Sequence, residues 1–278
     1  MKQFYLIMML FFAIASGATA QTTDIASIMQ KAEAGDATAQ NELGNIYSEG
    51  KGVSKNFTEA IKWYRKAAEQ GYADAQSNLG RCYFKGEGVT KDATEAVKWY
   101  TKAAEQGNSN AQFNLGNSYY NGEGVNKDFK EAVKWYTKAA EQGNSNAQFN
   151  LGNSYYNGEG VNKDFKEAVK WYTKAAEQGD SDAQFNLGYS YYNGEGVNKD
   201  FKEAVKWYTK AAEQGNSDAQ FNLGNSYYNG EGVNKDFKEA VKWYTKAAVQ
   251  GDSDAQFNLG NSYYNGEGVN KDFKEAVK

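Results

Sequence analysis

The stretch SNAQFNLGNSYYNGEGVNKDFKEAVKWYTKAAEQG, residues 109–143, decides the fold, because its pattern returns every 36 residues along the chain. The Leu-Gly pair recurs from Leu43 to Leu259, and the Trp-Tyr pair recurs from Trp63 to Trp243. A fixed period of this length is the signature of a repeat protein, in which each repeat packs on its neighbours. The chain holds six complete repeats and a seventh that stops at Lys278.

The first half of each repeat is predicted to be a helix. In the quoted repeat it runs over residues 110–121, where Ala111, Leu115 and Tyr119 are four residues apart and share one face. Gly116 leaves room there for the close approach of a neighbouring helix. Gly122 is predicted to end the helix in the left-handed conformation.

The second half is predicted to be another helix. Asp128, followed three residues later by Glu131, has the form of a capping box. Gly143 is predicted to end the helix. A pair of such helices cannot bury its apolar face alone, so we expect stacked pairs to complete the core. The apolar face of this second helix consists of Phe129, Ala132, Val133, Tyr136, Ala139 and Ala140.

Residues 1–20 are predicted to be a signal peptide. A basic Lys2 precedes an apolar run from Phe4 to Ala15, and Ala18 and Ala20 offer small residues for cleavage. No later segment is apolar enough to span a membrane. The chain is therefore predicted to be exported, to a periplasm or out of the cell.

Both ends of the array differ from its middle. Residues 21–35 are predicted to be an N-terminal capping helix with Ile25, Ile28 and Ala32 on one face. The repeat array then covers residues 36–278. Because the seventh repeat stops before its Trp-Tyr pair, we expect its first helix to be poorly covered.

The composition excludes several classes of function. Cleavage removes Lys2 from the 31 basic residues, which leaves 30 against 35 acidic ones, a net charge of −5. This mixed, slightly acidic chain is not expected to bind nucleic acid. Without histidine it has no His-based triad or His metal ligand. Its one cysteine, Cys82, forms no intrachain disulfide and is predicted to be a helix-packing residue.

The repeat resembles the Sel-like repeat family, a branch of the tetratricopeptide-repeat superfamily. The resemblance lies in residues 111–116, Tyr119, residues 122–125 and the Trp135-Tyr136 pair with its flanking alanines. It implies an all-α fold, an α-solenoid that winds as a right-handed superhelix of tandem antiparallel helix pairs with a 36-residue period. It also implies a bacterial scaffold that binds proteins through a concave surface lined by the first helices.

An enzyme is not predicted. The glycine loop of residues 122–128 lacks the spacing and the strand of a phosphate-binding loop. The loop and capping carboxylates recur in nearly every repeat, whereas an active site is one special place. No catalytic residue, cofactor or metal site is therefore predicted.

One surface feature is a candidate binding site. Asn side chains spaced 4, 3 and 4 form a ridge on the first helix, with Phe and Tyr seven residues apart beside it. Asn offers both donors and an acceptor, which suits a peptide or a sugar. The alternative is a solvated face of an Asn-rich chain, with Phe113 and Tyr120 packing between repeats. The candidate residues are Asn110, Phe113, Asn114, Asn117, Tyr120, Asn146, Phe149, Asn150, Asn153, Tyr156, Asp182, Phe185, Asn186, Tyr189, Tyr192, Asp218, Phe221, Asn222, Asn225 and Tyr228.

Two functions follow from this ridge. The first is an exported scaffold that binds a protein or peptide partner. The second is an envelope protein that binds a glycan or peptidoglycan through the Asn and aromatic side chains. Nearly identical repeats favour many weak contacts over one shaped pocket.

Overall fold

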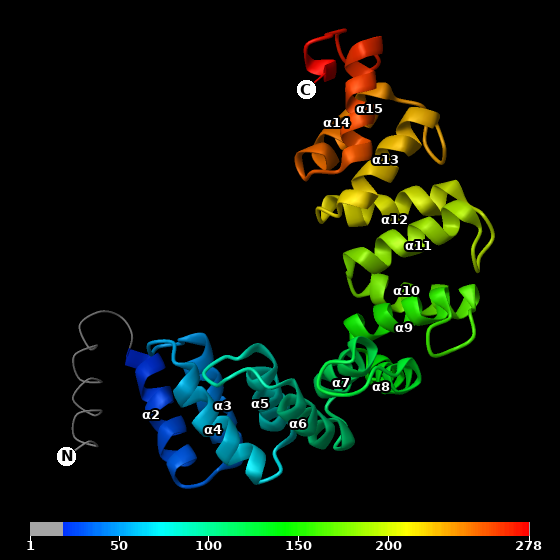
Figure 1. Cartoon of the computed structure of the whole chain (residues 1–278). Helices are drawn as coiled ribbons and strands as arrows, with labels where there is room; N and C mark the ends of the chain where they lie inside the picture. Colours follow the sequence, from blue (N-terminus) through cyan, green and yellow to red (C-terminus); the bar gives the residue numbers. More distant parts are fainter. Residues whose placement is uncertain (1–18, 278) are drawn as a thin grey trace. The chain divides into compact units, whose positions relative to one another are not determined.

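The computed structural model describes residues 19–277, which form helices joined by short loops and contain no strand. The all-α fold is thereby confirmed, and Figure 1 shows the helices in chain order. Each of the six complete repeats is one pair of helices of 13 residues each. The helices are α2 (Thr19–Glu33), α3 (Ala37–Glu49), α4 (Phe57–Glu69), α5 (Ala73–Lys85), α6 (Ala93–Glu105), α7 (Ser109–Asn121), α8 (Phe129–Glu141), α9 (Ser145–Asn157), α10 (Phe165–Glu177), α11 (Ser181–Asn193), α12 (Phe201–Glu213), α13 (Ser217–Asn229), α14 (Phe237–Val249), α15 (Ser253–Asn265) and the 3₁₀ helix η1 (Glu275–Val277).

The chain divides into two compact units. One unit extends to Trp135 and the other runs from Tyr136 to Lys278. From α2 to α7 and from α9 to α15, each helix contacts the next one along the chain, as α9 contacts α10 and α10 contacts α11. Each unit is therefore a stack of helix pairs, the arrangement of an α-solenoid.

The ends of the helices follow from a few residues in each repeat. In α11 the Asp180 carboxylate accepts a hydrogen bond from the Ala183 amide, and Gly194 ends the helix with φ +78°. In α12 the Asp200 carboxylate caps the amides of Lys202 and Glu203. Both N-caps satisfy amides that have no partner within the helix.

The predicted capping box at the second helix is wrong in one half. In the quoted repeat, Asp128 caps the Glu131 amide as predicted. The Glu131 carboxylate pairs with Lys134 instead of reaching back to Asp128. The Asp128 amide already donates to the Tyr119 carbonyl at 2.9 Å, so it needs no second partner. The corresponding Glu also pairs with a Lys in the later repeats, as Glu167 does with Lys170.

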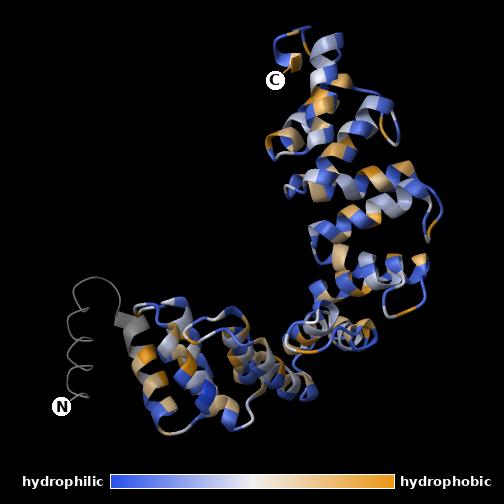
Figure 2. Ribbon diagram, in the orientation of Figure 1, coloured by the Kyte–Doolittle hydropathy of each residue, from blue (hydrophilic) through white to orange (hydrophobic). Residues whose placement is uncertain are grey.

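The core is built from the apolar faces of both helices. Leu187, Trp171 and Tyr172 are at most 6% exposed, as the sequence predicts for the Leu-Gly and Trp-Tyr positions. A Cβ atom on Gly152 would lie 2.6 Å from the Tyr172 ring, so the glycine is what allows α10 to approach α9. Figure 2 shows apolar and polar residues mixed along the helices, as amphipathic helices require.

The glycine loop packs one repeat against the preceding one. Gly196 has φ +75°, and a Cβ atom there would lie 2.1 Å from the carbonyl oxygen of Phe165 in α10. The same contact recurs between Gly232 and the Phe201 carbonyl oxygen in the next repeat. The loop glycines at these positions therefore serve packing between repeats.

The two ends of the described chain differ as expected. Ile25 and Ala32 of α2 are buried in one cluster with Leu43. Because α2 begins at Thr19, the boundary between the signal peptide and the capping helix at residue 21 stays a prediction. At the other end Phe257 is 69% exposed, so α15 is poorly covered. The body of the predicted signal peptide, residues 1–18, lies outside the described residues. No helix among residues 19–277 is long and apolar enough to cross a membrane.

Cys82 is a packing residue, as predicted. Its side chain is 0% exposed and lies in one cluster with Leu79 and Tyr64. Burial raises the pKa of the Cys82 thiol to about 11. The thiol is therefore protonated and inert at neutral pH.

Candidate partner-binding face

On each first helix the predicted ridge residues share one face, but they lie at different depths. Five of them are exposed, namely Asn110, Asn146, Asp182, Asp218 and Tyr189. The other fifteen are half-buried, including Phe149, Asn150 and Tyr156 of α9. The candidate site is therefore a shallow surface that is partly built into the packing of the repeats.

The third Asn of the ridge supports the core. Asn153 accepts a hydrogen bond from the hydroxyl of the buried Tyr172 at 2.7 Å, and Asn225 accepts one from Tyr244 at 2.8 Å. The prediction treated these Asn residues as part of a surface ridge. They have a structural role as well, because each satisfies the one polar atom of a buried tyrosine.

The same Asn side chains join consecutive first helices. The Asn186 amide donates to Asn153 at 3.2 Å, and the Asn258 amide donates to Asn225 at 3.3 Å. The pairs connect α9 with α11 and α13 with α15. Adjacent first helices of this unit thus present their ridge positions side by side.

The aromatic members of the site also contribute to packing. The rings of Phe149 and Tyr172 lie 6.1 Å apart, and those of Tyr156 and Phe165 lie 5.1 Å apart, edge to face. The Tyr156 hydroxyl donates to the Glu195 carboxylate of the next repeat at 2.9 Å. The two ring contacts lie within one repeat, and the Tyr156–Glu195 hydrogen bond joins this repeat to the next. These rings therefore contribute to packing, although they are also half-exposed.

We expect these tyrosines to make the fold sensitive to alkaline pH. Burial first, and then the hydrogen bond to a carboxylate, raises the pKa of Tyr156 and of Tyr192 to about 12, above the usual 10.0. A raised folded-state pKa means that stability is intact below about pH 10 and is lost as the pH rises through about 12. The midpoint of urea unfolding should therefore fall over this window, together with the appearance of tyrosinate absorbance.

A matched variant isolates these hydroxyls from the lysines that titrate in the same range. Replacing Tyr156, Tyr192 and Tyr228 by phenylalanine removes the donors to Glu195, Glu231 and Glu267. This variant should lose less stability between about pH 10 and 12 than the unmodified chain. An equal loss in both proteins would show that other groups govern the alkaline transition.

Sequence reasoning missed a buried glutamine in the first helix of each of the six complete repeats. Gln184 is 4% exposed, donates to the Ala176 carbonyl at 3.0 Å and accepts from Gln214 at 2.8 Å. Gln148 and Gln220 make the same contacts in the adjacent repeats. The available signal was the recurrence of Gln beside a buried Ala in every repeat, which surface residues do not require.

Charge is segregated between the two helices of a repeat in the second unit. The first helices α9, α11, α13 and α15 contain no Lys or Arg, and their only charged residues are Asp182, Asp218 and Asp254. The second helices carry the lysines, as in α10 with Lys166, Lys170 and Lys174. The charged residues that the first helices themselves contribute to this unit are therefore all acidic, while loop lysines such as Lys199 lie near their tyrosine rings.

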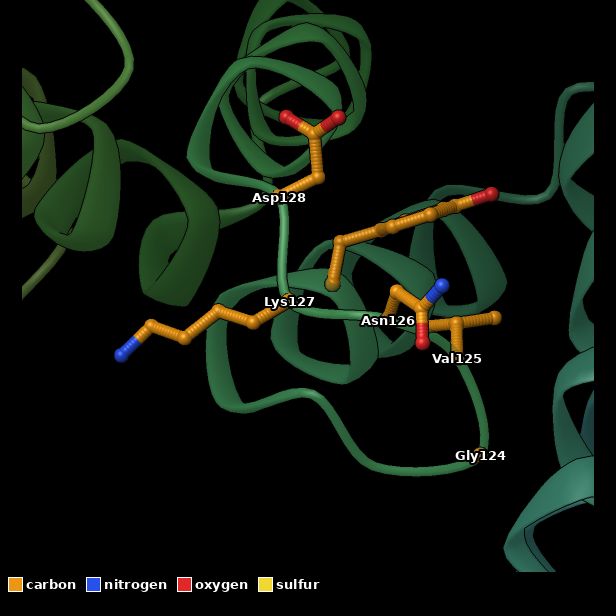
Figure 3. Close-up of a pocket in the computed structure, with 6 residues that line it drawn as sticks. Gly124, Val125, Asn126, Lys127 and Asp128 are labelled. Carbon is orange, nitrogen blue, oxygen red and sulfur yellow. The ribbon is translucent and has the colours of Figure 1, made fainter.

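The glycine loop forms an open hollow of about 710 Å³ in the third full repeat. It is lined by Tyr119 and residues 124–128, and similar hollows recur in later repeats. In Figure 3 the side chains of Asn126, Lys127 and Asp128 point in different directions. Side chains that diverge in this way do not converge on a phosphate. Among the described residues, no group of three or more His, Cys, Asp or Glu is placed to hold a metal ion.

The comparison with protein families covers almost the whole described chain. The Sel1 repeat matches residues 37–72, 73–108, 109–144, 145–180, 181–216, 217–252 and 253–278. These boundaries agree with the helix pairs of the structure.

Two solved structures share this architecture. One is that of c5321, a protective antigen of uropathogenic Escherichia coli with an SLR fold, which is 43% identical with a TM-score of 0.86 over 91% of this chain and 54% of that chain. The other is a Sel1 repeat protein of Oxalobacter formigenes, 38% identical with a TM-score of 0.76 over 86% of this chain and 94% of that chain.

A curated relative matches over a shorter segment. The secretory immunoglobulin A-binding protein EsiB of Escherichia coli is 43% identical over 69 residues, which are 24% of this chain and 14% of EsiB. This chain thus spans about half the length of c5321 and aligns with a small part of EsiB.

Proposed function

Because the chain belongs to the Sel1 repeat family, a scaffold fold that generally mediates protein–protein interaction, we propose that it is an exported scaffold that binds a protein partner. The binding surface is the concave side lined by the first helices. Partner recognition uses the Asn and aromatic side chains of these helices rather than a catalytic site.

One observation carries this proposal. Within the second unit, Asn186 bonds Asn153 and Asn258 bonds Asn225, so ridge positions of adjacent repeats form a shared polar surface. Such paired positions place polar side chains along the first helices, where an extended partner can contact more than one repeat. Many similar contacts along one face give useful affinity through avidity.

Export is supported by the sequence and by the character of the relatives. The first twenty residues have the basic start, apolar run and small residues of a signal peptide. The relative EsiB is described as binding secretory immunoglobulin A, a protein ligand. A periplasmic or secreted location in a bacterium fits both observations.

The test is affinity capture of proteins from an envelope extract of the source organism. The chain is compared with a variant in which Asn114, Asn150, Asn186 and Asn222 are changed to alanine. We expect the unmodified chain to retain a protein that the variant loses, because the ridge amides are replaced by methyl groups.

A second variant provides the matched control. The exposed loop residues Asn126, Asn162, Asn198 and Asn234 are changed to alanine, which removes the same number of amides away from the ridge. This control should retain the partner. Equal retention by all three proteins would exclude the ridge as the binding site. Retention of insoluble peptidoglycan instead of any protein would favour the glycan-binding alternative.

A further inference from the structure

The repeat of residues 181–216 departs from its neighbours at one important position. Tyr189 stands where the adjacent repeats have Asn153 and Asn225. In those repeats the Asn side chain accepts the hydroxyl of the buried tyrosine, at 2.7 and 2.8 Å. A tyrosine at this position cannot supply the amide oxygen.

The exchange leaves two groups without their usual partner. In the part of the chain that the structure describes, the Tyr208 hydroxyl is buried and has no hydrogen-bond partner. Asn222 does not reach across to α11, as Asn186 reaches Asn153, but donates to the Asp218 carbonyl of its own helix at 2.8 Å. An unpaired buried hydroxyl costs stability, so the exchange is unfavourable for folding.

The exchange also creates an aromatic surface. Tyr189 is 39% exposed, and its ring lies 6.3 Å from that of Phe185. The ring of the buried Tyr208 lies 5.9 Å from Phe185 and 6.5 Å from Tyr192. The unpaired hydroxyl thus belongs to a group of rings, one of which is open to solvent.

Acidic residues lie on the same first helices, one to two turns before this aromatic surface. Asp182 precedes Tyr189 by two helical turns on α11, and Asp218 precedes Asn222 by one turn on α13. Asp182 accepts a hydrogen bond from Asn216 at 2.9 Å. In the next repeat Asp252 replaces that Asn donor. The carboxylates of Asp218 and Asp252 therefore lie close enough to interact.

This crowding of carboxylates favours a cation. Burial first, and then the charges of Asp252 and Asp182, raises the pKa of Asp218 above its usual value. The first helices of this unit contribute no Lys or Arg to neutralise these charges, and the loop residue Lys199 lies 5.7 Å from the Tyr192 ring. An exposed aromatic ring on the same helices as a row of carboxylates is a favourable environment for a guanidinium or ammonium group.

We propose that Tyr189 and the neighbouring Asp182 and Asp218 form the anchoring position for a basic, extended segment of the protein partner. An Arg or Lys side chain stacks on the Tyr189 ring and pairs with the carboxylates. The Tyr189 ring turns outward, and a main-chain carbonyl of the segment accepts the hydroxyl of Tyr208. This inference rests on the proposed function, since it specifies the partner of the first-helix face.

The test uses two labelled peptides, one alternating arginine with glycine and the other alternating glutamate with glycine. Fluorescence anisotropy measures their binding to the full chain at physiological ionic strength. We expect only the arginine peptide to bind. Tyr189→Asn should weaken its binding about tenfold, and Tyr208→Phe about fivefold, by loss of the stacking and of one hydrogen bond.

Stability measurements separate these effects from unfolding. Tyr189→Asn should raise the midpoint of urea unfolding, because the introduced amide satisfies Tyr208. Tyr208→Phe should leave the midpoint unchanged or raise it. The matched control Tyr172→Phe removes a hydroxyl that Asn153 does satisfy, so it should lower the midpoint and leave peptide binding unchanged.

Three outcomes would overturn the inference. These are equal binding of both peptides, binding of the arginine peptide that neither Tyr189→Asn nor Tyr208→Phe weakens, and no binding of the arginine peptide at all. The last outcome leaves the scaffold function intact, because capture by the ridge Asn side chains is measured independently. If the unmodified chain captured no protein but still bound the arginine peptide, only the proposed function would be contradicted.

Discussion

Replacing Gly196 by alanine is expected to lower the free energy of unfolding by about 3 kcal/mol. Two effects add. The residue has φ +75°, a conformation that costs an L-residue about 1 kcal/mol or more. The new methyl group would also lie 2.1 Å from the Phe165 carbonyl oxygen, and relieving that clash costs about 2 kcal/mol because backbone must move. Urea unfolding followed by tryptophan fluorescence measures the loss.

Gly179 is the matched control for this substitution. It has φ +95°, yet a Cβ atom there would meet nothing within 4 Å. Gly179→Ala should therefore cost only the conformational strain, about 1 kcal/mol. If both substitutions lowered the free energy of unfolding by the same amount, the loop would accommodate the methyl group at little cost. Contact between the loop and the preceding repeat would then be unimportant for stability.

Gln184→Ala is expected to cost about 2–3 kcal/mol. The substitution removes the donor to the Ala176 carbonyl and the acceptor of the Gln214 amide. Because Gln184 is only 4% exposed, it also leaves a cavity that water does not fill freely. Thermal and urea unfolding should both report the loss.

The last repeat offers the same residue without burial. Gln256 donates to the Ala248 carbonyl at 3.1 Å, but its side chain is exposed. Water replaces an exposed donor, so Gln256→Ala should cost about 0.5 kcal/mol. If both variants lose the same amount, burial of the glutamine is not what makes it important.

The repeat period and the core could be predicted from sequence because they depend on local spacing. Leu187 and Tyr208 lie on helical faces that periodicity alone identifies, and both are buried. Gly194 and Gly196 also follow from the pattern, since each stands where a helix or a loop must turn.

What sequence missed depends on contacts between helices. The Asp128 amide donates to the Tyr119 carbonyl, so the expected bond from Glu131 does not form. Asn153 looks like a surface residue until the hydroxyl of Tyr172, 19 residues later, is placed beside it. The importance of Tyr189 likewise emerges only from the buried hydroxyl that it leaves without a partner.

The buried thiol of Cys82 has a kinetic consequence. The chain has one cysteine, and it lies in the unit that ends at Trp135. Since the folded thiol is fully covered and protonated, a thiol reagent modifies it only during an opening of that part of the chain. The rate of modification therefore measures how often the helices around α5 open locally. Opening of the repeats after Tyr136 does not contribute to this rate, because those repeats contain no cysteine.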